Sequence, residues 1–296
     1  MKRKLLIFAL TLLALTVQTQ GVEAQNARKA KHAKPEVVID KVNYRITYSV
    51  KSVKDENYRD SAGNYRYEDD VMRLDIGNKV SRFYSYLIQQ NDSVIAAKLD
   101  KGNYFPIPSM KYGSMAWVLY KNYPEGKTVV FESMFRDVYR MEETTRQPGW
   151  NIVADSSATI MGYSCQMARA NFKGRTWTAW YTEDIPLDFG PWKLCGLPGL
   201  ILRAYDDSRQ YIFEGVGLQQ LDGSADITYR KEYDKAETIS AQEFTELKRK
   251  TSPIDQLTAA GIKISFDDVA IPTDDGGTER MEDAFRRRQP YNPIER

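Results

Sequence analysis

The sequence contains one histidine and two cysteines, and these scarcities restrict the chemistry that the protein can perform. The histidine is His32, in a basic stretch without apolar periodicity that we expect to be a flexible tether. Catalysis by Ser-His-acid or Cys-His groups needs an imidazole held against the nucleophile, so hydrolases of these kinds are disfavoured. Histidine-rich zinc sites are excluded on the same ground, and we predict neither a catalytic residue nor a metal site.

Phosphate-binding motifs are also missing. The sequence has no Gly-x-Gly-x-x-Gly and no phosphate loop of the form Gly-x-x-x-x-Gly-Lys-Ser/Thr, and the pair Gly215 and Gly217 follows a predicted strand without a helix after it. The acidic pairs at 267–268 and 274–275 lack the spacing of a calcium loop with its glycine and distal glutamate. We therefore expect no cofactor.

Long hydrophobic runs are absent except at the start of the chain. Three basic residues precede an apolar run over 5–17, and a small-x-small pattern ends at Ala24, which is typical of a cleaved secretion signal. Its removal takes away three basic residues and Glu23, so the formal charge falls from +2 to zero and gives no argument for nucleic acid. We expect an exported protein, periplasmic or secreted, whose mature chain has no transmembrane segment.

What the sequence does contain is alternation with a period of two. Runs at 37–51, 72–76, 80–86, 163–181 and 200–216 alternate apolar and polar residues and are rich in Tyr, Trp, Phe, Val and Thr. These runs predict a mainly β protein built on a curved antiparallel sheet, either a half-open barrel or a sandwich. Ser240 followed by Glu243 forms a capping box, which predicts a short helix before Pro253 and hence a small helical C-terminal addition.

Four aromatic residues cluster in sequence around the turn at 190–202: Trp177, Trp180, Tyr181 and Trp192. Strand aromatics usually pack in a core, and this is the favoured interpretation; the alternative is a surface that stacks on an apolar ligand or a partner. Alternation places Trp177 and Tyr181 on one face of the strand and Trp180 on the other, so one face could be core while the other is available.

The two cysteines, Cys165 and Cys195, both follow the predicted cleavage point. Two cysteines in an exported chain most simply pair, so we predict a disulfide. A reactive thiol and a metal site with two sulfurs are the alternatives. In the chain-entropy model a disulfide closing this loop would stabilise the fold by roughly 3–4 kcal/mol.

The most distinctive stretch contains a structural turn, in which Gly199 supplies backbone freedom where Pro198 removes it. Its six residues, Gly196, Leu197, Pro198, Gly199, Leu200 and Ile201, resemble the signature of the GLPGLI family, secreted bacterial proteins without an assigned activity. Residues 178–186 and 190–193 are similar to the central block of that family, residues 71–86 to its earlier strands, and 291–295 to its C-termini. The resemblance implies membership and no catalytic residue.

Together these observations predict four segments. They are a signal peptide over 1–24, a basic flexible tether over 25–37, a β-rich GLPGLI-type domain over 38–232, and a helical or irregular C-terminal extension and tail over 233–296.

Two hypotheses for the function remain. The favoured one is a non-catalytic periplasmic binding or carrier module for an apolar small molecule or an envelope protein, which rests on export, aromatic-rich strands and missing catalytic groups. The alternative is a carboxylate-dependent hydrolase acting on an envelope polymer, with Glu183 and Asp184 near the turn as its acids. Loop carboxylates usually face water, which weighs against the second hypothesis.

Overall fold

The computed structural model describes residues 34–100, 113–134, 137–259, 261, 269–273 and 277–296. The chain divides into two compact units, one of residues 32–245 with 290–296 and one of residues 1–31 with 246–289. The predicted signal peptide, His32 and most of the predicted tether lie outside the described residues. Among the described helices, none is both long and apolar enough to cross a bilayer.

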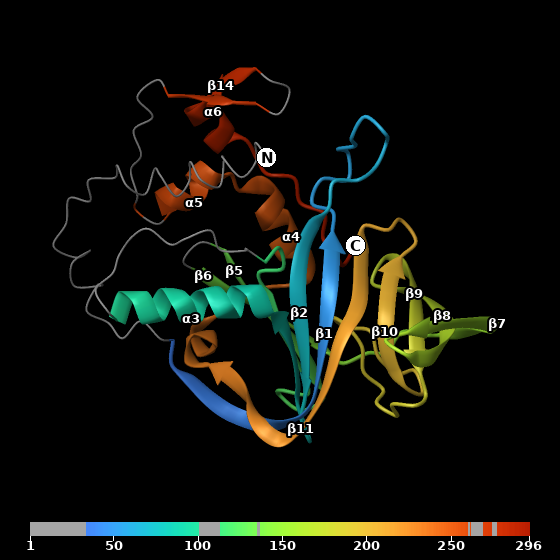
Figure 1. Ribbon diagram of the computed structural model, residues 1–296. Coiled ribbons are helices and arrows are strands. Elements are labelled where there is room, and N and C mark those ends of the chain that lie inside the picture. The colour runs from blue at the N-terminus through green and yellow to red at the C-terminus, as the bar shows by residue number, and fades with distance from the viewer. Residues whose placement is uncertain (1–33, 101–112, 135–136, 260, 262–268, 274–276) are drawn as a thin grey trace. The chain divides into compact units, whose positions relative to one another are not determined.

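The larger unit is built on one curved twelve-stranded sheet that is not closed into a barrel (Figure 1). The strand order is β12-β6-β5-β4-β3-β2-β1-β11-β10-β9-β8-β7, and the long strands β1 and β11 lie side by side at its centre. The strands are β1 (Glu36–Ser52), β2 (Glu68–Ile76), β3 (Ser81–Ser85), β4 (Trp117–Lys121), β5 (Lys127–Met134), β6 (Asp137–Thr144), β7 (Asn151–Ile160), β8 (Tyr163–Phe172), β9 (Arg175–Thr182), β10 (Leu200–Asp206), β11 (Tyr211–Arg230) and β12 (Glu237–Thr238).

Pairing in the sheet is antiparallel except between β12 and β6. The remaining elements are α3 (Tyr86–Asp100), η1 (Lys231–Lys235), α4 (Ala241–Lys250), α5 (Pro253–Ala259), β13 (Ala270–Pro272), β14 (Thr278–Arg280) and α6 (Met281–Arg286). The expected fold class, a curved antiparallel sheet with a small helical addition, is therefore confirmed. In the larger unit, the described strands form one sheet and not the two packed sheets of a sandwich.

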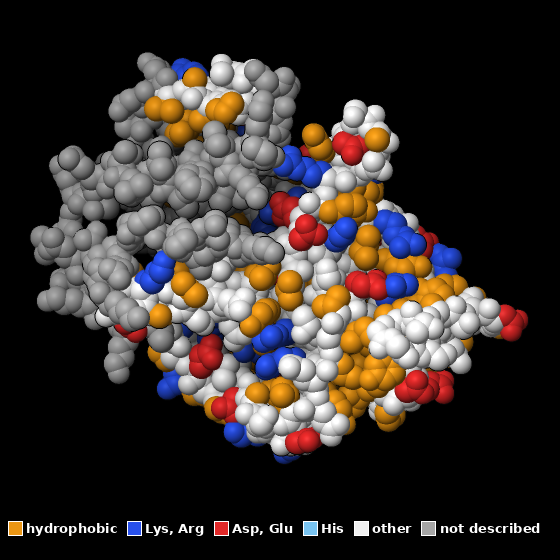
Figure 2. Space-filling model, in the orientation of Figure 1, with side chains coloured by type: hydrophobic (Ala, Val, Ile, Leu, Met, Phe, Trp, Pro, Cys, Tyr) orange, Lys and Arg blue, Asp and Glu red, His pale blue; other side chains and the backbone are white. Residues whose placement is uncertain are grey.

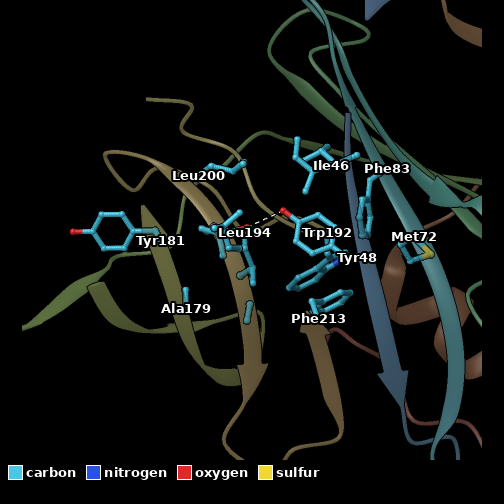
Figure 3. Packing of buried hydrophobic residues seen from close by; sticks show 14 of the residues in the cluster. Ile46, Tyr48, Met72, Phe83, Ala179, Tyr181, Trp192, Leu194, Leu200 and Phe213 are labelled. Carbon is cyan, nitrogen blue, oxygen red and sulfur yellow. Dashed lines mark hydrogen bonds between the residues drawn. The ribbon is translucent and has the colours of Figure 1, made fainter. Parts of the chain in front are cut away.

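The two faces of the sheet carry separate cores, as side-chain alternation requires. On one face, Ile46 and Phe83 pack with Trp192 and Phe213 (Figure 3). Leu74, the cross-strand neighbour of Ile46 and Phe83, belongs to the same buried cluster, as does Trp177. On the other face, aromatic residues gather around Tyr120. Their rings meet edge to face or stacked, and they are Tyr120, Tyr123, Phe131, Tyr229 and Tyr233.

The smaller unit has a short core of its own. Ile271, Met281, Ala284 and Phe285 are buried together, with Ile254 and Leu257 packed against them. β13 and β14 form a separate two-stranded sheet next to α6 in the chain. Apolar residues of α5 and α6 therefore hold this unit together.

The predicted capping box starts α4. Ser240 Oγ accepts a hydrogen bond from the Glu243 backbone N–H at 3.1 Å, and Glu243 Oε2 accepts one from the Ser240 N–H at 3.0 Å. These reciprocal bonds satisfy two of the backbone donors that a helix start leaves open. The helix ends at Lys250, before Pro253, as predicted.

Candidate binding site around residues 290–296

A buried arginine at the start of β9 organises the candidate site. The Arg175 side chain is 2% exposed and forms an ion pair with Asp206, whose side chain is 1% exposed. Arg175 Nη1 donates to Asp206 Oδ2 at 2.8 Å and to Gln210 Oε1 at 2.9 Å. Burial lowers the pKa of Arg175 and the Asp206 carboxylate opposes that shift. The β10–β11 turn thus supplies one side of the site.

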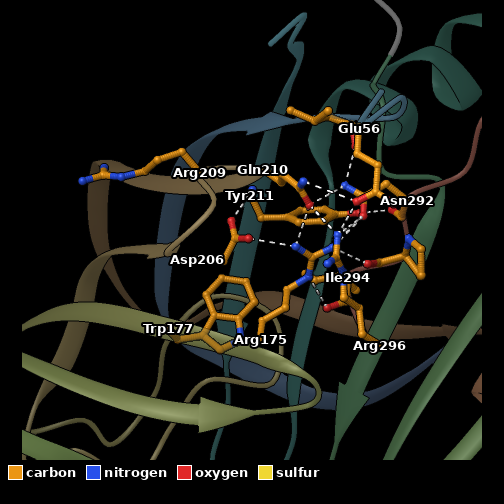
Figure 4. A network of polar contacts seen from close by, with 12 residues as sticks. Glu56, Arg175, Trp177, Asp206, Arg209, Gln210, Tyr211, Asn292, Ile294 and Arg296 are labelled. Atoms are coloured by element: carbon orange, nitrogen blue, oxygen red, sulfur yellow. Dashed lines mark hydrogen bonds and ion pairs between the residues drawn. The ribbon is translucent and has the colours of Figure 1, made fainter. Parts of the chain in front are cut away.

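The other side of the site is a segment from the end of the described chain. Residues 290–296, which we call the docked segment, belong to the same compact unit as the sheet. Arg175 Nη2 donates to Asn292 Oδ1 at 2.7 Å and to the Pro293 carbonyl at 2.6 Å, and Nε donates to the Ile294 carbonyl at 3.0 Å (Figure 4). Three of the five hydrogen bonds of this guanidinium therefore go to the docked segment.

Asn292 is the most deeply held residue of the docked segment. It is buried, and its Nδ2 donates to the Val53 carbonyl at 2.9 Å and to Gln210 Oε1 at 3.1 Å. Its backbone carbonyl accepts a hydrogen bond from the Tyr211 hydroxyl at 2.5 Å. An aspartate or a leucine of the same size could not both donate and accept in this way. The site therefore selects an amide side chain.

Charged residues continue the site toward the turn that carries the GLPGLI-like signature. Glu295 forms ion pairs with Lys193 and Lys173, and both lysines also contact Glu143. Burial acts to raise the pKa of Glu143, but Lys193 and Lys173 outweigh it and the pKa is lowered. A shallow hollow of roughly 330 Å³ lies along the β8–β9 turn, lined by residues 171–176.

The β8–β9 turn approaches the docked segment closely at Gly174. This residue has φ +75°, and a Cβ placed there would lie 2.5 Å from the Arg296 carbonyl oxygen. The Arg296 backbone N–H donates to the Lys173 carbonyl at 2.9 Å. Only glycine fits both the left-handed backbone and this contact.

The predicted aromatic cluster lies mostly inside the protein. Trp177, Tyr181 and Trp192 are buried, and Trp180 is partly buried against the same core. Trp177 and Tyr181 share a face of β9 and Trp180 takes the other, paired with Met167 and Arg203 on neighbouring strands, as alternation predicted. A ligand-binding role for these four rings stays a prediction.

The structural turn at 196–201 is held from several sides. Gly196 has φ +85°, and a Cβ on Gly199 would lie 2.0 Å from the Thr182 carbonyl oxygen, so glycine is required at both positions. The Tyr48 hydroxyl of β1 donates to the Ile201 carbonyl at 2.7 Å (Figure 3). The signature thus joins β9, β10 and the central strand.

The predicted disulfide between Cys165 and Cys195 is wrong. Both residues are free and buried. Cys165 lies on β8, where Arg203 and Asp184 are its charged neighbours, whereas Cys195 lies beside Lys121 and Asp188. Sheet pairing decides which residues meet, and it gives the two cysteines different neighbours although they are close in sequence.

The carboxylates of the hydrolase hypothesis, Glu183 and Asp184, are exposed in the turn after β9. In the ranges that the structure describes, no group of three His, Cys, Asp or Glu side chains could hold a metal ion. On the face seen in Figure 2, basic and acidic side chains are interspersed.

The chain resembles known proteins only in part. The model of the Porph_ging family, described as a protein of unknown function, matches residues 138–203, from β6 into β10 and across the structural turn. No curated protein matches the chain.

Among solved structures the chain is similar to PNGF-II, in crystals of space groups P21 and C2, with 14% identity and TM-scores of 0.44 and 0.42. The match covers 69% of this chain and 32% of PNGF-II, so the chain spans about a third of that protein. A likeness of this degree says nothing of activity.

Proposed function

We propose that this protein is an exported GLPGLI-type protein, periplasmic or secreted, that acts as a non-catalytic binding module for a short peptide segment of an envelope protein. The observation that carries the proposal is the Arg175 site, which already binds one such segment, its own residues 290–296. The matched family model across the structural turn and the resemblance of 196–201 to the GLPGLI signature support the family part of the proposal.

The contacts define the chemistry of the segment that fits. Backbone carbonyls of three successive residues accept hydrogen bonds, from Tyr211 to Asn292 and from Arg175 to Pro293 and Ile294, so the segment is recognised through its backbone as well as its side chains. The buried amide of Asn292 is recognised by both donors and acceptors. Lys173 and Lys193 pair with the following acidic residue. The ligand is therefore a peptide with asparagine, proline, an aliphatic residue and an acid in order.

The proposal is tested on the full chain after folding. A specific protease site is inserted between residues 289 and 290 and cut in the folded protein, and a fluorescent peptide of residues 290–296 is then added. We expect the labelled peptide to exchange into the site with saturable anisotropy, because the contacts that hold the segment are non-covalent. A labelled peptide with alanine in place of Asn292 is the control and should bind at least tenfold more weakly, since each lost buried hydrogen bond weakens binding by about 1 kcal/mol or more.

Two results would overturn the proposal. One is a cut segment that never exchanges with the labelled peptide while the protein stays folded by circular dichroism, which would make the site a purely structural joint. The other is equal affinity for the two labelled peptides, which would remove the specificity on which the binding role depends.

A further inference from the structure

A row of polar side chains crosses the sheet close to the structural turn at 196–201. The register pairs Ser81 with Lys121, Lys121 with Thr128, and Thr128 with Glu143. Residues directly opposite each other in neighbouring strands share a face and lie roughly 5 Å apart. Glu143, the last member, forms an ion pair with Lys193 at 2.6 Å. The row therefore leads to the segment that carries Cys195.

Lys121 is anomalous within this row. It is 7% exposed, and its Nζ makes no hydrogen bond of ordinary geometry, nor does the buried hydroxyl of its neighbour Ser81. Burial without a partner destabilises an ammonium ion relative to the uncharged amine. Burial accordingly lowers the pKa of Lys121, and the nearby Cys195 and Asp188 oppose this shift. An uncharged amine has a free lone pair and is a nucleophile.

The group beside this amine is the Cys195 thiol. Cys195 is 6% exposed and free, and its Sγ makes only a weak contact with the Lys193 carbonyl at 3.6 Å. Its position is fixed, because the Trp150 indole N–H donates to the Cys195 carbonyl at 2.8 Å and Lys193 is tied to Glu143. Two nucleophilic side chains from distant parts of the chain thus meet in one dry location, where an intramolecular reaction is strongly favoured over an intermolecular one.

We propose that Lys121 and Cys195 are a modification site, at which peroxide joins the cysteine sulfur to the lysine nitrogen in a covalent cross-link. The Cys195 sulfur attacks one peroxide oxygen, the O–O bond breaks, and water leaves with the thiol proton, which gives a sulfenic acid. The Lys121 nitrogen then attacks the sulfur, the S–O bond breaks, and the departing oxygen takes an amine proton and leaves as a second water. The sulfur is oxidised by two electrons and one peroxide is reduced.

This site is independent of the peptide-binding role proposed above. The cross-link joins β4, on one side of β1, to the segment that precedes β10 on the other side. It would supply the covalent connection that the two cysteines do not make with each other.

The experiment compares the folded protein before and after a stoichiometric dose of hydrogen peroxide, digested with trypsin without reductant. We expect cleavage after Lys121 to be lost, and the peptide containing Lys121 to appear joined to the one containing Cys195, lighter than the sum of the two by about 2 Da. A thiol reductant should restore the cleavage. An oxygen retained in the link would make the pair about 14 Da heavier than that sum, would consume a second peroxide, and would equally support the cross-link.

Matched variants separate this reaction from general oxidation. Cys165→Ser removes the other buried cysteine and should leave the cross-link unchanged, whereas Cys195→Ser should abolish it. The loss of cleavage after Lys121 is measured on the unaltered protein. The test therefore still works if one of the variants fails to fold. Sulfenic or sulfinic acid on Cys195 with normal cleavage after Lys121 would overturn the proposal, and so would a disulfide between Cys165 and Cys195.

Discussion

Arg175 and Lys121 are both buried cations on strands of one sheet, and they are treated in opposite ways. Arg175 has a buried carboxylate partner and five hydrogen bonds, drawn from the β10–β11 turn and from the docked segment. Lys121 has neither, and its pKa is lowered by burial. The comparison teaches that a buried charge is stabilised where distant segments supply its partners, and that without them burial lowers the pKa of the amine.

The largest loss of stability should come from removing Arg175, the buried cation that has its partners. Arg175→Ala leaves Asp206 buried and unpaired, and we expect the free energy of unfolding to fall by about 3–5 kcal/mol in urea titrations. Arg169→Ala is the matched control, because its pair with Asp207 has side chains 47% and 50% exposed and should contribute less than about 1 kcal/mol. Equal losses in the two variants would remove the distinction between these pairs.

A smaller loss should follow from changing the docked segment itself. Asn292→Ala leaves the Val53 carbonyl and part of the Arg175 fork without partners, so the free energy of unfolding should fall by about 1–3 kcal/mol. The exposed amide of Asn78 accepts a hydrogen bond from the Asn43 amide, and Asn78→Ala should change stability by under about 0.5 kcal/mol. Thermal unfolding of both variants checks this difference, which should vanish if the segment is not docked in solution.

Removing the amine of Lys121, which has no partner, should raise the free energy of unfolding and not lower it. Lys121→Met replaces a buried amine by an apolar chain of similar length, and the variant should be more stable than the parent protein by roughly 1 kcal/mol at neutral pH. The folded protein binds fewer protons than the unfolded chain between the lowered pKa of Lys121 and the ordinary value of 10.5. Stability of the parent protein therefore rises with pH in that window, and the advantage of the variant shrinks.

Urea titrations at pH 7 and at about pH 10 measure this change. Lys127→Met, at a lysine with a partly exposed side chain, is the control and should show no such convergence. An advantage that grows with pH would mean that Lys121 keeps its charge in the fold.

The smallest expected effect concerns the contact between the β8–β9 turn and the docked segment. It is measured by comparing two glycines that both have a left-handed backbone. Gly174→Ala and Gly126→Ala carry the same strain, since φ is +75° and +73°, but only Gly174 meets Arg296. Each alanine should cost about 1 kcal/mol for backbone strain, and Gly174→Ala should cost up to about 1 kcal/mol more because the docked segment must move. Identical midpoints would show that Arg296 gives way without penalty.

Much of the fold follows from local patterns in the sequence. The hairpin predicted over 163–181 is present as β8 and β9 with its turn at Lys173 and Gly174, whose positive φ values suit a tight hairpin. The helix α3 has no buried residue, so its apolar spacing gives only a weak signal in the sequence. The alternating pattern also failed to show β6 and β7, where exposed edge residues weaken the contrast between faces.

The binding site was not predictable in the same way. Arg175, Asp206 and Asn292 lie far apart in the sequence, and an aspartate beside a hairpin turn usually faces water, so its type gives no sign of a buried partner. The only signal was the resemblance of residues 291–295 to other C-termini. The prediction of a disulfide was wrong because it used only the expected redox environment and the number of cysteines. Neither reveals the sheet register, which gives Cys165 and Cys195 different neighbours.

The docked segment also has a consequence for how the protein is made. Residues 290–296 leave the ribosome after every strand of the twelve-stranded sheet, so the sheet can assemble while Arg175 still lacks three of its partners. Synthesis must pass residue 294 before that guanidinium has all of its partners. A chain released before residue 290 would keep every strand of the twelve-stranded sheet but leave three donor positions of a charged side chain unused, a mark by which proteases could tell unfinished copies from complete ones.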